Sequence, residues 1–176
     1  MALSFSLDKK RGKKCFMVAA RELGIAWDNT PQYWEWLSRP DSRFSEVATL
    51  KWVCWLDIRG KIETQILSKR TKYVPYLVFK LEDRSHGLGN ANAVVRFVDS
   101  ESDNEAEQRA IVVRVSGRGL RATLPLRRDD GWMEIKLGNF FNDTAEDGVV
   151  DARLMEIRCL GGKSGLIVQR MEFRPE

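Results

Sequence analysis

An alternation of apolar side chains with a period of two is the feature that most restricts how this chain can fold. Two segments show it most clearly, the first with Met133, Ile135 and Leu137 at every second position and the second with Met155, Ile157 and Cys159. Such a period places alternate side chains on opposite faces of a β-strand. Segments such as TKYVPYLVFKLE and NAVVRFVDS are rich in β-branched and aromatic residues, and turn-rich segments such as EDRSHGLGN, SESDNEAEQ and RRDDG separate them. The pattern predicts an all-β fold, a β-sandwich of jelly-roll type.

Helical signals are weak by comparison. The segment SRFSEVATLKW is expected to form at most a turn or two of helix capped by Ser42 or Ser45, and GNFFND a short helical turn. Pro75 lies within a strand-like run, and we expect it at a sheet edge or a bulge because proline cannot donate a ladder hydrogen bond. These short helical turns do not change the predicted class.

Length and composition indicate one folded domain. The chain has 176 residues, of which 43% are hydrophobic and 31% charged. No apolar run approaches the ~20 residues that cross a bilayer, so we expect no membrane insertion. The N-terminus has a short apolar start followed by a basic cluster, the reverse of a secretory signal. We therefore expect the protein to be made and kept in the cytosol.

The charge is mildly basic, with a formal net charge of +4. Lys9, Lys10, Arg11, Lys13 and Lys14 form one dense cluster, which marks residues 1–14 as a basic N-terminal arm. The arm is interpreted as a solvated, poorly ordered segment or, alternatively, as a nuclear localisation patch. Nucleic acid ranks last among the partners considered, because no nucleic-acid-binding motif accompanies the charge.

No constellation for catalysis or metal binding stands out. The three cysteines, Cys15, Cys54 and Cys159, are scattered without a CxxC pair, so we expect three free and mostly buried thiols. His86 is the single histidine, which leaves no histidine pair for a metal and no local support for a catalytic triad. The sequence predicts a protein that is not an enzyme and that needs no metal or cofactor.

Aromatic residues gather in one part of the chain. Five of the six tryptophans fall between Trp27 and Trp55. Trp52 and Trp55 lie in an apolar, strand-like run and are assigned to the core. Trp27 and Trp34 instead flank the polar loop DNTPQY, and an indole face in such a loop can stack on the C–H-rich face of a sugar. Core packing remains the alternative for each of these rings.

Five segments in order give the chain a family resemblance: AARELGIAWDNTPQYWEW, WLDIRGKIETQILSKRTKYVPYLVFKLED, DDGWMEIKLGNFFND, EDGVVDARLMEI and KSGLIVQRMEFRP. Together they resemble the phloem protein 2 family, the Nictaba-related plant lectins, from about Cys15 to Pro175. The opening FSLDKKRGKKCFM also resembles the linker that enters the lectin half of F-box members of that family.

The resemblance implies that residues 15–176 form a carbohydrate-binding domain of jelly-roll type without catalytic activity. Such lectins bind N-acetylglucosamine (GlcNAc) oligomers or the core of N-glycans, in the cytosol and nucleus or in phloem sap. Trp27 and Trp34 match the tryptophans tied to binding in the family, with Tyr33 and Trp36 expected to hold the loop. Asn29 and Gln32 are candidate hydrogen-bonding neighbours by position.

One departure from the family pattern concerns the C-terminal part of the chain. Relatives often carry Trp-Lys-Ser-Gly where this chain has Gly162-Lys163-Ser164-Gly165, so an aromatic is missing beside Lys163, the fifth candidate site residue. That difference keeps an alternative open, a protein-interaction module acting as the substrate-reading half of an F-box ubiquitin-ligase adaptor. A homodimer presenting two sugar sites is a further expectation, because it would strengthen weak binding.

Overall fold

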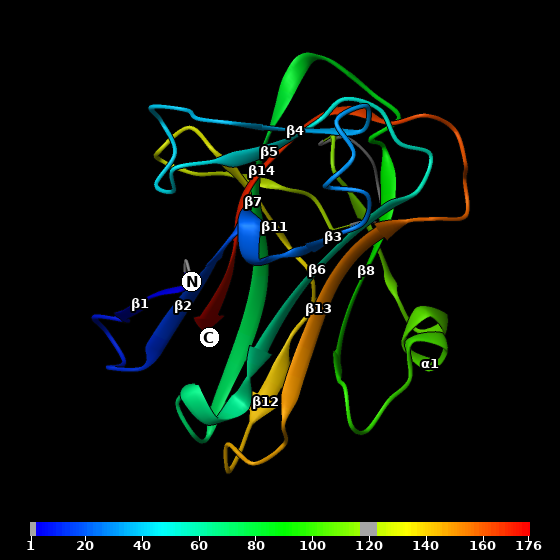
Figure 1. Ribbon diagram of the computed structural model, residues 1–176. Helices are drawn as coiled ribbons and strands as arrows, with labels where there is room; N and C mark the ends of the chain where they lie inside the picture. The colour runs from blue at the N-terminus through cyan, green and yellow to red at the C-terminus, as the bar shows by residue number, and fades with distance from the viewer. Residues whose placement is uncertain (1–2, 117–122) are drawn as a thin grey trace.

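The computed structural model describes residues 3–116 and 123–176 and shows two antiparallel β-sheets packed face to face around one core (Figure 1). Strands make up almost all of the regular structure. The predicted all-β class, a β-sandwich of jelly-roll type, is confirmed.

The larger sheet has nine strands, with the two long strands β7 and β14 paired at its centre. Its path runs β1-β2-β14-β7-β11-β10, while β12 pairs with β7 and the β4–β5 hairpin pairs with β14 through β5. The strands of this sheet are β1 (Leu3–Leu7), β2 (Lys14–Ala19), β4 (Trp34–Leu37), β5 (Val47–Leu50), β7 (Thr71–His86), β10 (Leu126–Arg127), β11 (Met133–Lys136), β12 (Phe140–Asn142) and β14 (Ser164–Pro175).

The smaller sheet has five strands in the order β3-β6-β13-β8-β9, all antiparallel to their neighbours. They are β3 (Gly24–Ile25), β6 (Leu56–Glu63), β8 (Asn90–Phe97), β9 (Ile111–Arg114) and β13 (Val149–Glu156).

The core confirms part of the predicted alternation. Ile135 and Leu137 are fully buried between the sheets. On β13 the core-facing residues are Val150, Ala152 and Leu154, out of phase with the predicted set that contained Met155, Ile157 and Cys159. Met155 and Ile157 instead pack in a small cluster on the outer face of the sheet, and Cys159 is exposed. Both faces of β13 are covered, so hydrophobicity alone did not identify the core face.

Helical structure in the described residues is limited to α1 (Asp103–Gln108) and the 3-10 turns η1 (Ala20–Glu22) and η2 (Thr64–Ile66). The helix α1 lies in a segment predicted as a turn. The Ser102 hydroxyl accepts from Glu105 N at 3.2 Å, and the Glu105 carboxylate accepts from Ser102 N at 2.9 Å. This Ser-x-x-Glu capping box was present in the sequence as a helix signal.

The two segments that were expected to form helical turns contain strands. Residues Val47–Leu50 form β5, which pairs with both β4 and β14, and Phe140–Asn142 form β12, which pairs with β7. Both helix predictions are therefore wrong, because pairing with long neighbouring strands outweighs a weak local preference.

The expectation for Pro75 is also wrong, since this residue lies in the central strand β7 and pairs with Phe173 of β14 without a register shift. Its carbonyl accepts from Leu137 N at 3.0 Å on the opposite side. A residue's N–H and C=O point to the same side of a strand, so the missing donor faces the break between β11 and β12. The one bond that proline cannot donate is the reciprocal bond to Leu137 O, just past the end of β11.

The basic N-terminal segment is part of the sheet. Strand β1 pairs with β2 in continuous register, from Leu3 opposite Val18 to Leu7 opposite Lys14. Lys9, Lys10 and Arg11 lie in the turn of this hairpin, where the Asp8 carboxylate accepts from the backbone N–H groups of Lys10 and Arg11. Within the described residues, no helix is long and apolar enough to span a membrane.

The strand directions bring four connections to one end of the sandwich (Figure 1). These connections are residues 26–33, 51–55, 87–89 and 157–163. The opposite end carries residues 67–70 and 143–148.

Candidate functional site

Four exposed aromatic rings surround a pocket at the end where the four connections meet. The pocket has a volume of about 290 Å³ and is lined by Trp27, Tyr33, Trp52, Val53, Cys54 and Trp55. Trp27 is 57% exposed, Trp52 48% and Trp55 42%. We call this the aromatic pocket. Exposed rings gathered around one hollow are unusual, because folding normally buries such surface.

Trp27 reaches solvent through an unusual backbone conformation. Its φ of 69° lies in the left-handed region, which costs a non-glycine residue about 1–2 kcal/mol. Hydrogen bonds on both sides hold the turn, from Ala26 N to Asp57 O at 3.0 Å and from Thr30 N to Trp27 O at 3.0 Å. Strain of this kind concentrates at functional sites, and here it accompanies a ring left in solvent.

Trp34 is 2% exposed and packs in the main core, so the expectation of an open indole at this position is wrong. Its Nε1 donates to Ala26 O at 3.1 Å, and the Nε1 of Trp36 donates to Asp28 O at 3.1 Å. These two indoles hold the loop that presents Trp27. Trp36 thus takes the supporting place expected for it, whereas Tyr33, expected in the same role, lines the pocket.

Asn29 and Gln32 are both exposed on that loop. Asn29 lines a separate shallow hollow of about 320 Å³, together with Asp28, Pro31 and Glu35. Burial raises the pKa of the Asp28 carboxyl, and the charge of Arg21 partly offsets the rise. Gln32 lines neither this hollow nor the aromatic pocket, so its binding role stays a prediction.

The assignment of Trp52 and Trp55 to the core is wrong, because both rings are exposed. Leu56 and Ile58 of β6 face the core with at most 1% exposure, and a period of two then places Trp55 on the other side. The sequence already shows this alternation, because the apolar Leu56 and Ile58 alternate with the charged Asp57 and Arg59. Trp52 lies parallel to His86, with an interplanar angle of 5° and ring centroids 6.4 Å apart.

Gly162 stands where relatives often carry tryptophan, and in this chain another aromatic ring fills that space. A Cβ added to Gly162 would lie 1.7 Å from Cζ2 of Trp52, so the Trp52 ring already occupies the space that a side chain at position 162 would take. An aromatic is therefore present at this place, but it comes from the β5–β6 connection.

Lys163 is 2% exposed, and its ammonium is used within the protein. Nζ donates to the carbonyls of Cys54 at 2.7 Å, Cys159 at 2.7 Å and Gly161 at 2.9 Å. The Lys163 and Val53 backbones also exchange hydrogen bonds of 2.8 and 3.0 Å. The prediction that Lys163 contacts sugar directly is wrong, because the side chain instead ties the β5–β6 connection to the β13–β14 connection.

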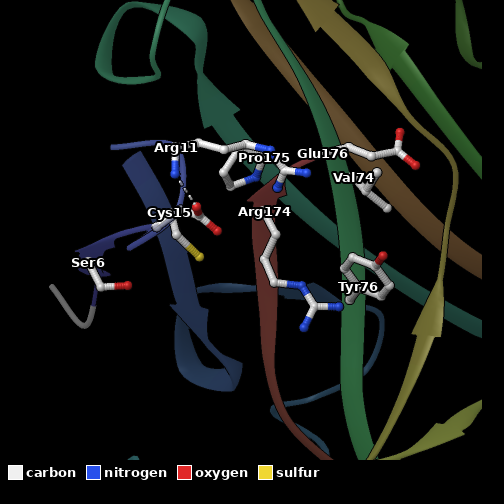
Figure 2. A pocket seen from close by; sticks show the side chains of 9 residues that line it. Ser6, Arg11, Cys15, Val74, Tyr76, Arg174, Pro175 and Glu176 are labelled. Atoms are coloured by element: carbon white, nitrogen blue, oxygen red, sulfur yellow. Dashed lines mark hydrogen bonds between the residues drawn. The ribbon is translucent and has the colours of Figure 1, made fainter. Parts of the chain in front are cut away.

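Another hollow, of about 430 Å³, lies between the β1–β2 hairpin and the C-terminal end of β14, where Figure 2 shows Arg174 beside Tyr76. Tyr76 is the one ring in its lining, and the Arg174 guanidinium covers it at 3.7 Å from the ring centroid. Arg174 also donates to Glu134 at 2.8 Å. In this hollow the Tyr76 ring is therefore covered by Arg174, and the Arg174 guanidinium is paired with Glu134. The hollow offers a sugar fewer free groups than the aromatic pocket does.

The cysteines differ from the expected pattern in exposure. Cys15 is half-buried, and burial raises the pKa of its thiol, while Cys54 and Cys159 are exposed. All three are free, but the expectation that they are mostly buried is wrong. Within residues 3–116 and 123–176, no group of His, Cys, Asp and Glu side chains has an arrangement suited to a metal ion.

Two solved structures share the architecture of this chain. A family 35 carbohydrate binding module from Clostridium thermocellum matches 90% of this chain and 96% of its own, with a TM-score of 0.50 and 9% identity. A Podospora anserina GH26-CBM35 β-(1,4)-mannanase matches 92% of this chain and 28% of its own, with a TM-score of 0.51 and 10% identity. The class defined by the fold is thus a β-sandwich like that of these modules.

The chain belongs to the phloem protein 2 family, whose sequence pattern matches residues 13–175. An F-box protein of Arabidopsis thaliana is 42% identical over 98% of this chain and 55% of its own length. F-box protein PP2-B10 of the same plant is 42% identical over 96% of this chain and 63% of its own. The chain therefore spans 55–63% of the length of these two relatives.

Proposed function

We propose that this domain is a non-catalytic lectin that binds GlcNAc oligomers or the GlcNAc-containing core of N-glycans in the aromatic pocket. The observation that carries the proposal is the set of four exposed rings, Trp27, Tyr33, Trp52 and Trp55, around one hollow. The family membership and the fold shared with carbohydrate-binding modules support it.

Indole faces suit this ligand because they pair with the C–H-rich faces of a pyranose and exclude water. Each aromatic contact adds about 0.5–1.5 kcal/mol beyond the burial of area. The rings also cost little to order, since tryptophan has only two side-chain torsions. Binding of a single sugar is therefore expected to be weak, and pairing two domains in a homodimer would strengthen it.

The test is retention on a chitin resin. We expect Trp55→Ala and Trp52→Ala each to lose retention while keeping the thermal unfolding temperature close to that of the unchanged protein. Phe141→Ala is the matched control, because Phe141 is a ring of similar exposure, 53%, on β12 at the opposite end. Equal retention of all three variants would remove the aromatic pocket as the site.

Trp34→Ala must be interpreted differently. Loss of a buried indole costs about 3–5 kcal/mol, so this variant is expected to lose binding through unfolding. Retention should therefore be compared with circular dichroism for each protein.

A second candidate function is a protein-interaction module that selects substrates for an F-box ubiquitin ligase. The observation that favours it is the match to F-box proteins over nearly all of this chain but only 55–63% of their lengths. A glycan array without signal, alongside capture of one defined protein through the same aromatic residues, would favour this function over the first.

A further inference from the structure

We infer that the glycan occupies two adjoining subsites, the aromatic pocket and a second hollow beyond Trp52, so that the ligand is a linear oligosaccharide of at least two sugars lying across Trp52. This inference rests on the proposed function and assigns to it a second set of binding residues, centred on His86, Asn90 and Glu156.

The second hollow, which we call the loop pocket, lies between the β7–β8 turn and the β13–β14 connection. It has a volume of about 460 Å³, and its lining comprises His86, Gly87, Gly89, Asn90, Glu156, Cys159, Gly161, Gly162 and Lys163. The loop pocket lies within the range of ~300–1,000 Å³ that is common for small-ligand sites, and the aromatic pocket lies just below it.

One shared wall separates the two pockets. Trp52 lines the aromatic pocket, while the residues it contacts, His86 and Gly162, line the loop pocket. In the same way, Cys54 lines the aromatic pocket and its carbonyl accepts from the Lys163 ammonium, which belongs to the loop-pocket lining. The top of the wall is the Trp52 ring, which is 48% exposed, so a chain of sugars can cross it.

The wall is held in a fixed position. The paired Val53 and Lys163 backbones and the three carbonyls around Lys163 Nζ join its two connections. Gly87 packs so tightly on the far side that an added Cβ would lie 2.3 Å from the Gly162 carbonyl oxygen. A preorganised wall lowers the ordering cost of binding an extended ligand.

The chemistry of the loop pocket suits sugar hydroxyls and an acetamido group. Asn90 and His86 are exposed and offer both donors and acceptors. The Glu156 carboxylate is fixed at the pocket, because its Oε1 accepts from Cys159 N at 2.7 Å and from Arg158 N at 3.2 Å. Rings on one side and fixed polar groups on the other match successive units of one glycan chain.

Two neighbouring glycines provide the test. An added Cβ at Gly161 meets nothing within 4 Å, whereas the same addition at Gly162 collides with Trp52. Gly161→Phe should therefore fill the loop pocket without disturbing the wall. Gly162→Ala should displace Trp52 and weaken binding of ligands of every length. Phe141→Ala, at the opposite end of the sandwich, serves as the control and should behave like the unchanged protein.

The measurement is calorimetric affinity for GlcNAc, chitobiose, chitotriose and chitotetraose. For the unchanged protein we expect the affinity to rise by about tenfold, equivalent to about 1.4 kcal/mol, at the length that first reaches the loop pocket. Gly161→Phe should abolish this rise and leave the affinity for the shortest bound sugar unchanged. Asn90→Ala should reduce the rise, and it keeps the test decisive if the phenylalanine variant folds poorly.

The outcomes separate the inference from the proposed function. If the unchanged protein shows the length dependence and both loop-pocket variants retain it, the second subsite is overturned while sugar binding in the aromatic pocket stands. If the unchanged protein binds none of the four sugars, the proposed function fails and the inference falls with it.

Discussion

The two ends of the sandwich treat aromatic rings in opposite ways. At the end that carries residues 67–70 and 143–148, Tyr73 is fully buried, its hydroxyl donates to Lys14 O at 2.8 Å, and it accepts from Ser68 N at 3.0 Å. Its ring stacks on Phe140 at 5.7 Å. At the aromatic end, Trp27, Trp52 and Trp55 remain in solvent.

The difference shows what distinguishes a structural ring from one available to a ligand. At the Tyr73 end, polar side chains bond to backbone carbonyls of the protein itself, and the Asn142 Nδ2 likewise donates to Thr64 O and Ser68 O. The aromatic end uses polar contacts of the same kind, around Lys163 and Trp34, to hold open a surface of uncovered rings. The four predictions that follow test this contrast.

The largest effect is expected at the closed end. Tyr73→Ala should lower the free energy of unfolding by about 3–5 kcal/mol, because it leaves a cavity in the core. Tyr73→Phe keeps the ring and should cost about 1–2 kcal/mol through the lost hydroxyl contacts. Urea denaturation measures both values. Chitin retention of the folded Tyr73→Phe protein should stay unchanged. Loss of retention would mean that the Tyr73 end also contributes to sugar binding.

A smaller effect is expected at the wall of the aromatic pocket. Lys163→Met should destabilise the protein by about 2–3 kcal/mol, since three carbonyls lose a charged donor. It should also weaken glycan affinity by loosening the wall. Lys61→Met, at an exposed position on β6, is the control and should change neither quantity. A variant as stable as the unchanged protein would show that these three contacts do not hold the wall in place.

The backbone at Trp27 allows an effect on stability to be separated from an effect on binding. Trp27→Gly should raise the free energy of unfolding by about 1 kcal/mol relative to Trp27→Ala, because glycine adopts a φ of 69° without strain. Both variants should lose affinity for chitotriose to a similar extent. Thermal unfolding and calorimetry on the pair separate the two effects, and equal stabilities would mean that the turn is unstrained in solution.

The smallest effect concerns pH. Burial raises the pKa of Asp28 above its unfolded value of about 3.9, so its contribution to stability is present below that value and is lost as pH rises through the folded pKa. Asp28→Asn removes this dependence. Its free energy of unfolding relative to the unchanged protein should therefore increase between about pH 3.5 and pH 7. A difference that stays constant between these pH values would contradict the assignment.

Much of the architecture could be predicted from the sequence, and the errors have identifiable physical causes. The period of two indicated the sandwich and the core face of β11, because alternation acts locally along each strand. The same period did not identify the core face of β13, because the outer face of this strand is buried as well. Some residues there are ion-paired, and others are covered by the helix α1. Arg153 on that face is 4% exposed, and its guanidinium is bound by Asp57 and Glu107.

The candidate site was predicted only in part. Trp27 was selected correctly as an exposed ring, because it adjoins a polar loop. Trp34 was selected for the same reason, but the core contacts that bury it come from other strands. Trp52 and Trp55 were missed as pocket residues because an apolar run was taken to be core.

The sequence by itself determined the class of fold and the family, because strand periodicity and motif order are carried along the chain. Only the tertiary structure decided which indoles face solvent, because exposure depends on what distant segments place against each ring. Gly162 makes room for Trp52, and the Lys163 ammonium holds the carbonyl of Cys54, 109 residues earlier in the chain. Contacts between such distant positions leave no periodic signal in the sequence.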